Sequence, residues 1–290
     1  MKEYSSLIRP GDDEESAQSS GEDAISSLIA VSMSLIVILA SSITIIYLWK
    51  GQDGFVIERP SSALVSWQME YMELIGANNE SLAELNGEGV VVCVVDSGVD
   101  LGHPDLRGVE LRGWRDSING IEEPYDDEGH GTAMTGIIVS DGGLDGVAKG
   151  VDLLVAKAID DEGLGTDGTV SDSVDWCVEQ GADIISLSLG GSQSFGSDFF
   201  TTDELEQSVN DALDSGVFVV SSAGNDGEDD DGDVGSPGSV EDVICVGGIT
   251  RSGSIWSGSS EGDNDGRLWP NPILPRSDPD KKPEIVGPGH

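Results

Sequence analysis

From residue 90 onward, short apolar blocks alternate with longer segments in which apolar residues recur at helical spacing. In the clearest block, an unbroken run of apolar, mostly β-branched residues at 90–95 leads directly into Asp96 and a glycine turn. A continuous apolar run of this kind is typical of a strand that is buried on both faces of a parallel sheet. The pattern predicts further strands at 153–158, 184–187, 217–221 and 243–246, and helices at 132–140, 169–180 and 202–214.

This alternation predicts an α/β fold, a three-layer sandwich with a mainly parallel central sheet and right-handed crossover connections. Asp96 then lies at the carboxyl end of a central strand, the edge at which open α/β sheets place their functional groups. A carboxylate held by a buried strand requires a partner. The candidate partner is His130, in the sequence Gly-His-Gly-Thr at the start of the predicted helix.

The N-terminal part of the chain has a different pattern. Residues 1–23 are acidic and rich in serine, which predicts a disordered tail. No charged residue lies between Asp23 and Lys50. At about 1.5 Å per residue, positions 24–49 are long enough to cross a bilayer core of roughly 30 Å. A cleaved signal peptide has a basic start and a shorter apolar region, so an uncleaved transmembrane helix is favoured over that reading and over a buried globular helix. A linker at 50–66 then precedes one domain at 67–290.

The charge balance limits the partners. The chain has 14 Lys and Arg against 55 Asp and Glu, a net charge of −41. Nucleic acids and anionic lipids select basic surfaces, so neither is expected as a partner, and the acidic residues are interpreted as a solvated surface. The cysteines are few and odd in number, which does not indicate a disulfide framework, and Cys93, Cys177 and Cys245 are therefore predicted to be small core residues.

Three polar side chains are expected to meet at the carboxyl edge of the predicted sheet. They are Asp96, His130 and Asn225, and Asn225 follows Ser-Ala-Gly at the end of the strand at 217–221. A carboxylate that orients an imidazole is the supporting half of a nucleophilic triad, and an amide can donate to a developing oxyanion. Each residue has a simpler alternative role, as a turn acid, a helix cap or a turn amide.

Metal binding is the competing chemistry for the same region. His103 and Asp105 could form a site with Asp96 and Asp126, but His103 precedes a proline in a loop and no helical His pair is present. The acidic loops at 225–233 and 261–266 do not match the calcium-loop template, because required ligand positions carry other residues. No metal ligand is therefore assigned from spacing alone.

Five short motifs follow one another along the chain. They are Asp-Ser-Gly-Val-Asp at 96–100, His-Pro-Asp-Leu at 103–106, Gly-His-Gly-Thr at 129–132, Ser-Leu-Ser-Leu-Gly at 186–190 and Ser-Ala-Gly-Asn at 222–225. Together they resemble the motifs of the subtilisin-like serine proteases (subtilases, peptidase S8 family), in which the aspartate also precedes the histidine. The resemblance covers about residues 67–290, so the predicted domain would be a subtilisin-like peptidase domain.

The resemblance implies roles for particular residues. Asp96 and His130 would be two members of the triad, and Asn225 would be the oxyanion-hole residue. An extended peptide would pair as an added strand between two edges, and part of the wall of the primary specificity pocket would lie beside it. These substrate-binding positions are Gly163, Leu164 and Gly165 on one edge, Ser188, Leu189 and Gly190 on the other, and Ser222, Ala223 and Gly224 in the wall.

The resemblance requires no cofactor. In relatives the acid that matches Asp105 can bind structural calcium, but the loop near 140–145 looks too short to supply the other ligands. Structural calcium therefore stays open. Many subtilases also carry a folding pro-domain, for which the sequence before residue 90 leaves no evident room.

The main departure from the family pattern concerns the nucleophile. Residues 282–289 resemble the segment that precedes the family's Gly-Thr-Ser motif, yet no serine follows Ser277. Loss of that serine lowers kcat by about 10⁶-fold in subtilisin, so this chain as it stands is expected to be nearly inactive. Two accounts remain: an incomplete record of an active protease, which is favoured, or an inactive protein that binds peptides. A separate alternative for the function is a metal-dependent hydrolase that uses Asp96, His103 and His130.

The expected protein is thus a membrane-anchored serine endopeptidase that acts on protein or peptide substrates. Residues 24–49 would contact the lipid bilayer. Basic residues are balanced across this segment, with Lys2 and Arg9 before it and Lys50 and Arg59 after it, so they do not fix its orientation. The expectation that the catalytic domain lies outside the cell rests only on the resemblance to the family.

Overall fold

The computed structural model describes residues 12–50, 60–82, 84–189, 204–225, 227, 234–262 and 282–289. The chain divides into two compact units, Met1–Glu58 and Arg59–His290. The first unit contains one long helix, α1 (Asp12–Lys50). Its segment Ile25–Ile45 has a mean hydropathy of 2.4 and is long and apolar enough to cross a membrane.

Helix α1 differs from the expectation at its start. It includes residues 12–23, which the sequence analysis assigned to a disordered tail. Once the apolar segment has formed a helix, each further residue adds a hydrogen bond at little additional cost, so the helix extends into the acidic sequence before it. Residues 1–11 and 51–59 lie outside the described residues.

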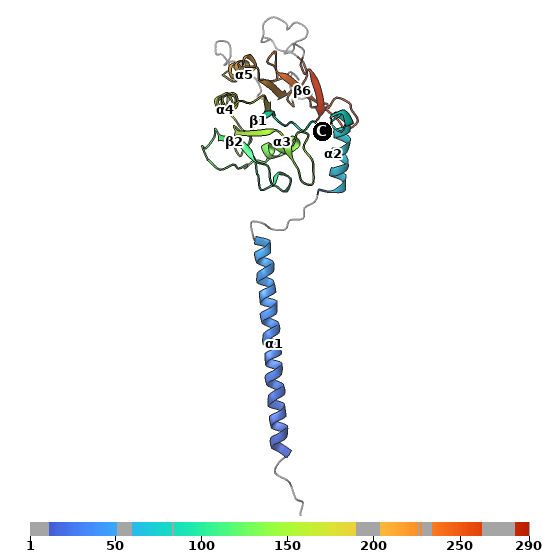
Figure 1. The fold of residues 1–290 in the computed structure, drawn as a ribbon, viewed down its shortest axis with the longest axis vertical. Helices are drawn as coiled ribbons and strands as arrows, with labels where there is room; N and C mark the ends of the chain where they lie inside the picture. The colour runs from blue at the N-terminus through green and yellow to red at the C-terminus, as the bar shows by residue number, and fades with distance from the viewer. Residues whose placement is uncertain are drawn as a thin grey trace, which may run out of the picture. The chain divides into compact units, whose positions relative to one another are not determined.

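The described part of the second unit contains a seven-stranded sheet with the order β2-β3-β1-β4-β5-β6-β7 (Figure 1). All of its neighbouring strands are parallel. The strands are β1 (Val91–Asp96), β2 (Leu111–Asp116), β3 (Asp152–Lys157), β4 (Ile184–Leu187), β5 (Phe218–Ser222), β6 (Ile244–Ile249) and β7 (Ile285–Pro288).

Strand β1 is the point at which the strand order reverses. The chain leaves β1 for the edge strand β2, returns through β3 to one side of β1, and then places β4 on the other side. Ligands in open α/β sheets bind outside the carboxyl ends of the strands at such a reversal. Asp96, the last residue of β1, is therefore at the position where this topology places a functional site.

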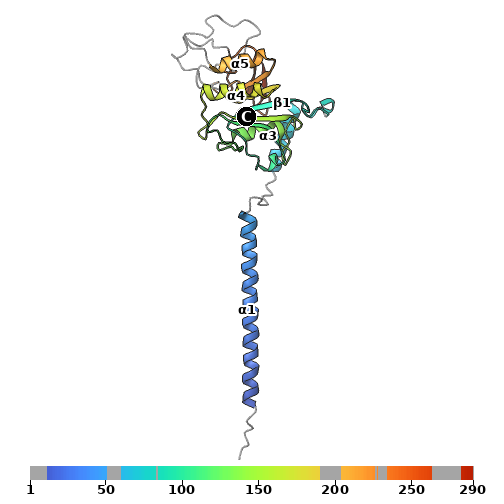
Figure 2. The ribbon, with the colours of Figure 1, turned by 60° about the vertical axis from the view of Figure 1, so that its left-hand side comes forward.

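Helices cover both faces of the sheet around β1, which confirms the predicted sandwich. Figure 2 shows β1 between α4 and α3. Cys93 and Val95 pack with α4 and α5, whereas Val94 packs with α3, because successive residues of a strand point to opposite faces. The helices of this unit are α2 (Ser62–Leu74), α3 (His130–Val139), α4 (Asp167–Glu179) and α5 (Glu204–Asp214), with 3-10 turns at Glu80–Leu82 and Pro104–Leu106.

Several boundaries differ from the prediction. Strands β2 and β7 were not predicted, and β2 reads Leu-Arg-Gly-Trp-Arg-Asp because an edge strand that stays half exposed does not need an unbroken apolar run. Helix α2 begins at Ser62, inside the segment assigned to the linker at 50–66. The first two residues of the helix predicted at 202–214 lie outside the described residues.

The cysteines require a correction. Cys93 of β1 and Cys177 of α4 form a disulfide with a Cα–Cα distance of 5.9 Å, and Cys245 is free and buried. All three are core residues, as predicted, but two of them are paired. The pairing arises because α4 packs on the face of the sheet to which Cys93 points, a contact that spacing in the sequence does not reveal.

Candidate active site

The carboxylate of Asp96 and the imidazole of His130 are in contact. His130 Nδ1 lies 2.8 Å from Asp96 Oδ1 and 3.0 Å from Asp96 Oδ2. Asp96 is 2% exposed, whereas the side chain of His130 is 47% exposed. A buried carboxylate thus holds one ring nitrogen, and an exposed imidazole is available to exchange a proton at the other.

Two glycines allow α3 to begin directly against the turn after β1. A Cβ atom on Gly131 would lie 2.3 Å from the carbonyl oxygen of Gly98. A Cβ atom on Gly98 would lie 2.1 Å from the carbonyl oxygen of Tyr125, and the φ angle of Gly98 is +122°. This close approach of two backbone segments brings His130 within reach of Asp96.

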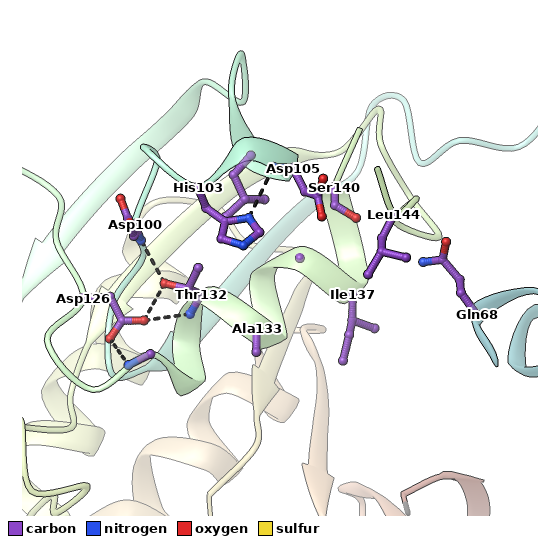
Figure 3. Close-up of a pocket in the computed structure, with 13 residues that line it drawn as sticks. Gln68, Asp100, His103, Asp105, Asp126, Thr132, Ala133, Ile137, Ser140 and Leu144 are labelled. Atoms are coloured by element: carbon purple, nitrogen blue, oxygen red, sulfur yellow. Dashed lines mark hydrogen bonds between the residues drawn. The ribbon is translucent and has the colours of Figure 1, made fainter. Parts of the chain in front are cut away.

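Asp126 organises the loop that leads to His130. Its Oδ1 accepts hydrogen bonds from Ser97 Oγ (2.9 Å) and Gly129 N (2.8 Å). Its Oδ2 accepts from Thr132 N (2.8 Å) and Thr132 Oγ1 (2.5 Å), as Figure 3 shows. Burial raises the pKa of Asp126, but these hydrogen bonds outweigh it and hold the pKa below its ordinary value. Asp126 was predicted only as a possible metal ligand, and its bond to Thr132 N in the first turn of α3 has no N-cap signal in the sequence, because the residue at the N-cap position is Gly129.

The pKa of His130 is raised above its ordinary value of 6.5. The hydrogen bond that His130 donates to Asp96 is the main cause, desolvation opposes it, and the negative charges of Asp96, Glu128 and Asp126 add to it. The charged imidazole therefore stabilises the fold at pH below about 6.5, and this contribution is lost as the pH rises through the folded-state pKa.

This pKa predicts the pH dependence of catalysis. If His130 is the general base that the sequence predicts, it must be neutral to act, so kcat/KM for peptide hydrolysis is expected to fall as the pH drops through a midpoint above 6.5. Because His130 is half exposed, added salt should screen the nearby charges and move the midpoint down. A pH profile of peptide hydrolysis at two salt concentrations measures both, and a midpoint below 6.5 would contradict the expectation.

Asn225 follows β5 and lines a cavity of about 300 Å³ at the carboxyl edge of the sheet. Ser188, Ser222, Ala223 and Gly224 line the same cavity. Ser222 Oγ donates to the carbonyl oxygen of Leu189 at 3.3 Å, so the ends of β4 and β5 are held together. The structure therefore brings together around Asn225 all three residues of the predicted pocket wall and Ser188 of one predicted substrate edge. Gly190 lies outside the described residues.

The other predicted substrate edge follows β3. Asp160 Oδ1 accepts hydrogen bonds from Glu162 N and Leu164 N, both at 2.9 Å, and Gly163 has a φ angle of +77°. Leu164 is 61% exposed. Gly163, Leu164 and Gly165 are exposed at the surface, but this turn already uses the N–H groups of Gly163 and Leu164 and the carbonyl oxygen of Leu164 in hydrogen bonds with Asp160.

The residues around Asp105 do not fit a calcium site (Figure 3). Asp105 Oδ1 accepts a 2.5 Å hydrogen bond from Gly143 N, and the side-chain amide of Gln68 is hydrogen-bonded to the backbone N and O of Asp145. The ammonium of Lys149 bonds the carboxylates of Asp141 (2.7 Å) and Asp145, whose hydrogen bonds raise the pKa of Lys149. Hydrogen bonds and a lysine thus hold the loop that calcium would hold. Within the described ranges, no group of three or more His, Cys, Asp or Glu side chains could bind a metal.

This arrangement predicts how the stability of the chain responds to the loss of Lys149 and to a chelator. Lys149→Met is expected to lower Tm by about 2–4 °C, because the exposed ion pairs contribute only about 1 kcal/mol. EDTA is expected to leave the Tm of the unmodified chain unchanged. Thermal unfolding followed by circular dichroism measures both, and a fall in Tm on adding EDTA that calcium reverses would contradict this account of the loop.

Comparison with known proteins identifies the class. The profile of the subtilase family matches residues 87–290, and the chain therefore belongs to this family. It is 35% identical over 217 residues to the serine protease AprX of Bacillus subtilis (strain 168), which covers 71% of this chain and 47% of that protein. It is 31% identical over 193 residues to subtilisin DY of Bacillus licheniformis, covering 65% and 67% of the two chains.

A solved structure shows the same fold. A cold-adapted subtilisin-like serine proteinase superposes with a TM-score of 0.56 at 28% sequence identity, covering 71% of this chain and 65% of that one. The intracellular serine protease of Paenibacillus polymyxa is 36% identical over 187 residues, which is 61% of this chain and 55% of that protein. The chain spans about half the length of this relative and of AprX.

Proposed function

We propose that this chain is the catalytic part of a membrane-anchored, subtilisin-like serine endopeptidase that hydrolyses peptide bonds by acyl transfer. The observation that supports the proposal is the hydrogen bond between Asp96 and His130 at the reversal point of the sheet. The family and the fold of the chain agree with it.

In the proposed reaction, a serine hydroxyl attacks the peptide carbonyl while His130 Nε2 takes its proton and later returns it to the leaving amine. Asp96 holds Nδ1, which fixes the tautomer of the ring and stabilises the imidazolium. Asn225 donates a hydrogen bond to the oxyanion of the tetrahedral intermediate. The substrate lies as an added strand against Gly163–Gly165 and Ser188–Gly190.

We place the nucleophile on a segment that would cover an open face of the sheet. On the face that β4–β7 share with α3, Phe218 is 63% exposed and Ile285 is 52% exposed, whereas parallel sheets are normally covered on both faces. Among the described elements, α3 covers β1 on this face. A helix that carries the serine and packs on β4–β7 would bury these residues and complete the site.

The coding sequence after codon 290 and a fluorophosphonate probe test this proposal. We expect an in-frame Gly-Thr-Ser, covalent labelling of its serine in the full-length gene product, and loss of labelling in the Ser→Ala variant. An absent Gly-Thr-Ser, with peptide binding but no turnover, would contradict the proposal and favour the peptide-binding alternative. Hydrolysis that resists the probe and is lost on chelation would instead indicate a metal-dependent hydrolase.

We also propose that α1 anchors the protein in the bilayer, with the catalytic unit outside the cell. Ile25–Ile45 is long enough to span the hydrocarbon core. The Cys93–Cys177 disulfide supports an oxidising compartment for the unit that follows. Alkaline carbonate extraction and proteolysis of intact cells test the two parts. Release into the soluble fraction would contradict the anchor, and full protection from added protease would contradict the orientation.

A further inference from the structure

A buried lysine lies on the strand next to Asp96 of the candidate dyad and has no part in the reaction described above. Lys157 ends β3 beside Asp96 of β1, and its side chain is 0% exposed. Burying an ammonium is costly unless its partners are well placed. The contacts of Lys157 therefore indicate what the residue does.

All three N–H groups of the Lys157 ammonium have an acceptor. They donate to the carbonyl oxygens of Ser97 (2.7 Å) and Ile159 (2.8 Å) and to Asp127 Oδ1 (2.6 Å). The ammonium also lies 5.0 Å from the centroid of the Tyr125 ring, a favourable cation–π distance. The three acceptors belong to three separate segments, so one side chain joins the turn after β1, the exit of β3 and the loop before α3.

Ser97, one of these acceptors, contacts Asp96 and the residue that follows His130. Its backbone N donates to Asp96 Oδ1 at 2.7 Å, and its Oγ accepts from Gly131 N, next to His130, at 2.8 Å. Fixing the Ser97 carbonyl therefore fixes the turn that orients the Asp96 carboxylate. Asp127, the second acceptor, lies in the loop that leads into His130.

We propose that Lys157 is a positioning residue that sets the placement of His130 against Asp96 by tying the turn after β1 to the loop before α3. The inference rests on the proposed roles of Asp96 and His130. Lys157 touches neither reacting group, so it acts through Ser97 and Asp127. The sequence signal for it is a single charge inside the apolar strand pattern at 153–158.

The chain offers a matched control for a purely structural role. Lys282 is also 0% exposed, and it donates to the carbonyl oxygens of Glu241 (3.1 Å) and Val243 (2.7 Å) and pairs with Glu284 (2.5 Å). It holds the β6–β7 side of the sheet and contacts neither the Asp96 turn nor the His130 loop. Removing either buried lysine together with its acid should destabilise the fold. Only the removal of Lys157 and Asp127 should also disturb the contact between Asp96 and His130.

The test compares Lys157→Met/Asp127→Asn with Lys282→Met/Glu284→Gln in the full chain in detergent micelles. Each double variant removes one positive and one negative charge, so the net charge is unchanged. NMR of the histidine side chains gives the pKa of His130 and the resonance of its Nδ1 proton, and His103→Gln and His290→Gln variants assign the signals. Neither readout requires turnover, so a failure here is distinct from a failure of the protease proposal.

We expect the first variant to lower the pKa of His130 toward 6.5 and to broaden or remove the Nδ1 proton resonance. The second variant should retain the His130 pKa and the Nδ1 proton resonance, even if its Tm falls as much as that of the first variant. In the full-length gene product, kcat should fall for the first variant while KM changes little. Unchanged His130 signals in the folded first variant, or equal changes in both variants, would overturn the proposal.

If the first variant does not fold, Asp127→Asn decides the question. Asp127 is 39% exposed at its side chain, and its replacement leaves Lys157 bonded to both carbonyl oxygens. Loosening the loop should speed exchange of the His130 Nδ1 proton with water by about tenfold. An exchange rate equal to that of the unmodified chain would overturn the proposal.

Discussion

Replacing Asp96 with asparagine is expected to lower kcat for peptide hydrolysis by about 10⁴-fold in the full-length gene product. The carboxylate accepts a hydrogen bond from His130 Nδ1 at a distance of 2.8 Å, which leaves Nε2 free to act as the base. An amide can instead donate to Nδ1, which selects the wrong tautomer, and it cannot stabilise the imidazolium. Steady-state kinetics with a peptide substrate measure the loss.

The control for this prediction is Asp100→Asn. Asp100 lies in the same turn, its side chain accepts a hydrogen bond from Gly102 N, and it is not among the charges that raise the pKa of His130. Its replacement should therefore leave kcat within about twofold, as is usual for an exposed polar change. Retention of more than a tenth of the activity by Asp96→Asn would show that this carboxylate does not orient the base.

The second large effect concerns the disulfide between β1 and α4. Cys93 and Cys177 are 84 residues apart, and closing a loop of this size in the unfolded chain corresponds to about 4.5 kcal/mol in the chain-entropy estimate. We expect Cys93→Ala/Cys177→Ala to lower Tm by about 10 °C or more. Thermal unfolding of the variant and of the unmodified chain, each with and without reductant, measures this difference.

Cys245 provides an internal control for the disulfide. It is free and buried, and burial raises the pKa of its thiol to about 12. The denatured, unreduced chain should therefore show one reactive thiol, and the reduced chain should show three. Three reactive thiols before reduction would contradict the pairing. In that case the double variant should lose only the small stabilisation that the packing of two cysteine side chains contributes.

The substrate-binding edges stay predictions. The cavity beside Asn225 gathers Ser188, Ser222, Ala223 and Gly224, and the turn at Gly163–Gly165 is exposed after β3. The roles of these residues follow from the family resemblance and require a bound peptide to test them. Within the site, the contact between Asp96 and His130 is the part that the structure describes most directly.

The sequence by itself determined the elements and their order. Unbroken apolar runs such as 90–95 specify buried strands because a strand covered on both faces needs apolar side chains at every position. The same local pattern placed Asp96 at a strand end and His130 at a helix start, and the motifs around them identified the family. It gave no signal for edge strand β2, whose half-exposed residues do not form such a run.

The sequence predicted that Asp96 and His130 meet, but only the tertiary structure supplied the geometry of that contact and revealed the other long-range pairings. Asp96 and His130 are 34 residues apart, and their contact depends on two glycines that let α3 approach the turn after β1. The pairing of Cys93 with Cys177 and the three contacts of the Lys157 ammonium likewise join separate segments. Local pattern fixes the face to which a side chain points, but strand register and helix packing fix its neighbours, and these depend on the whole fold.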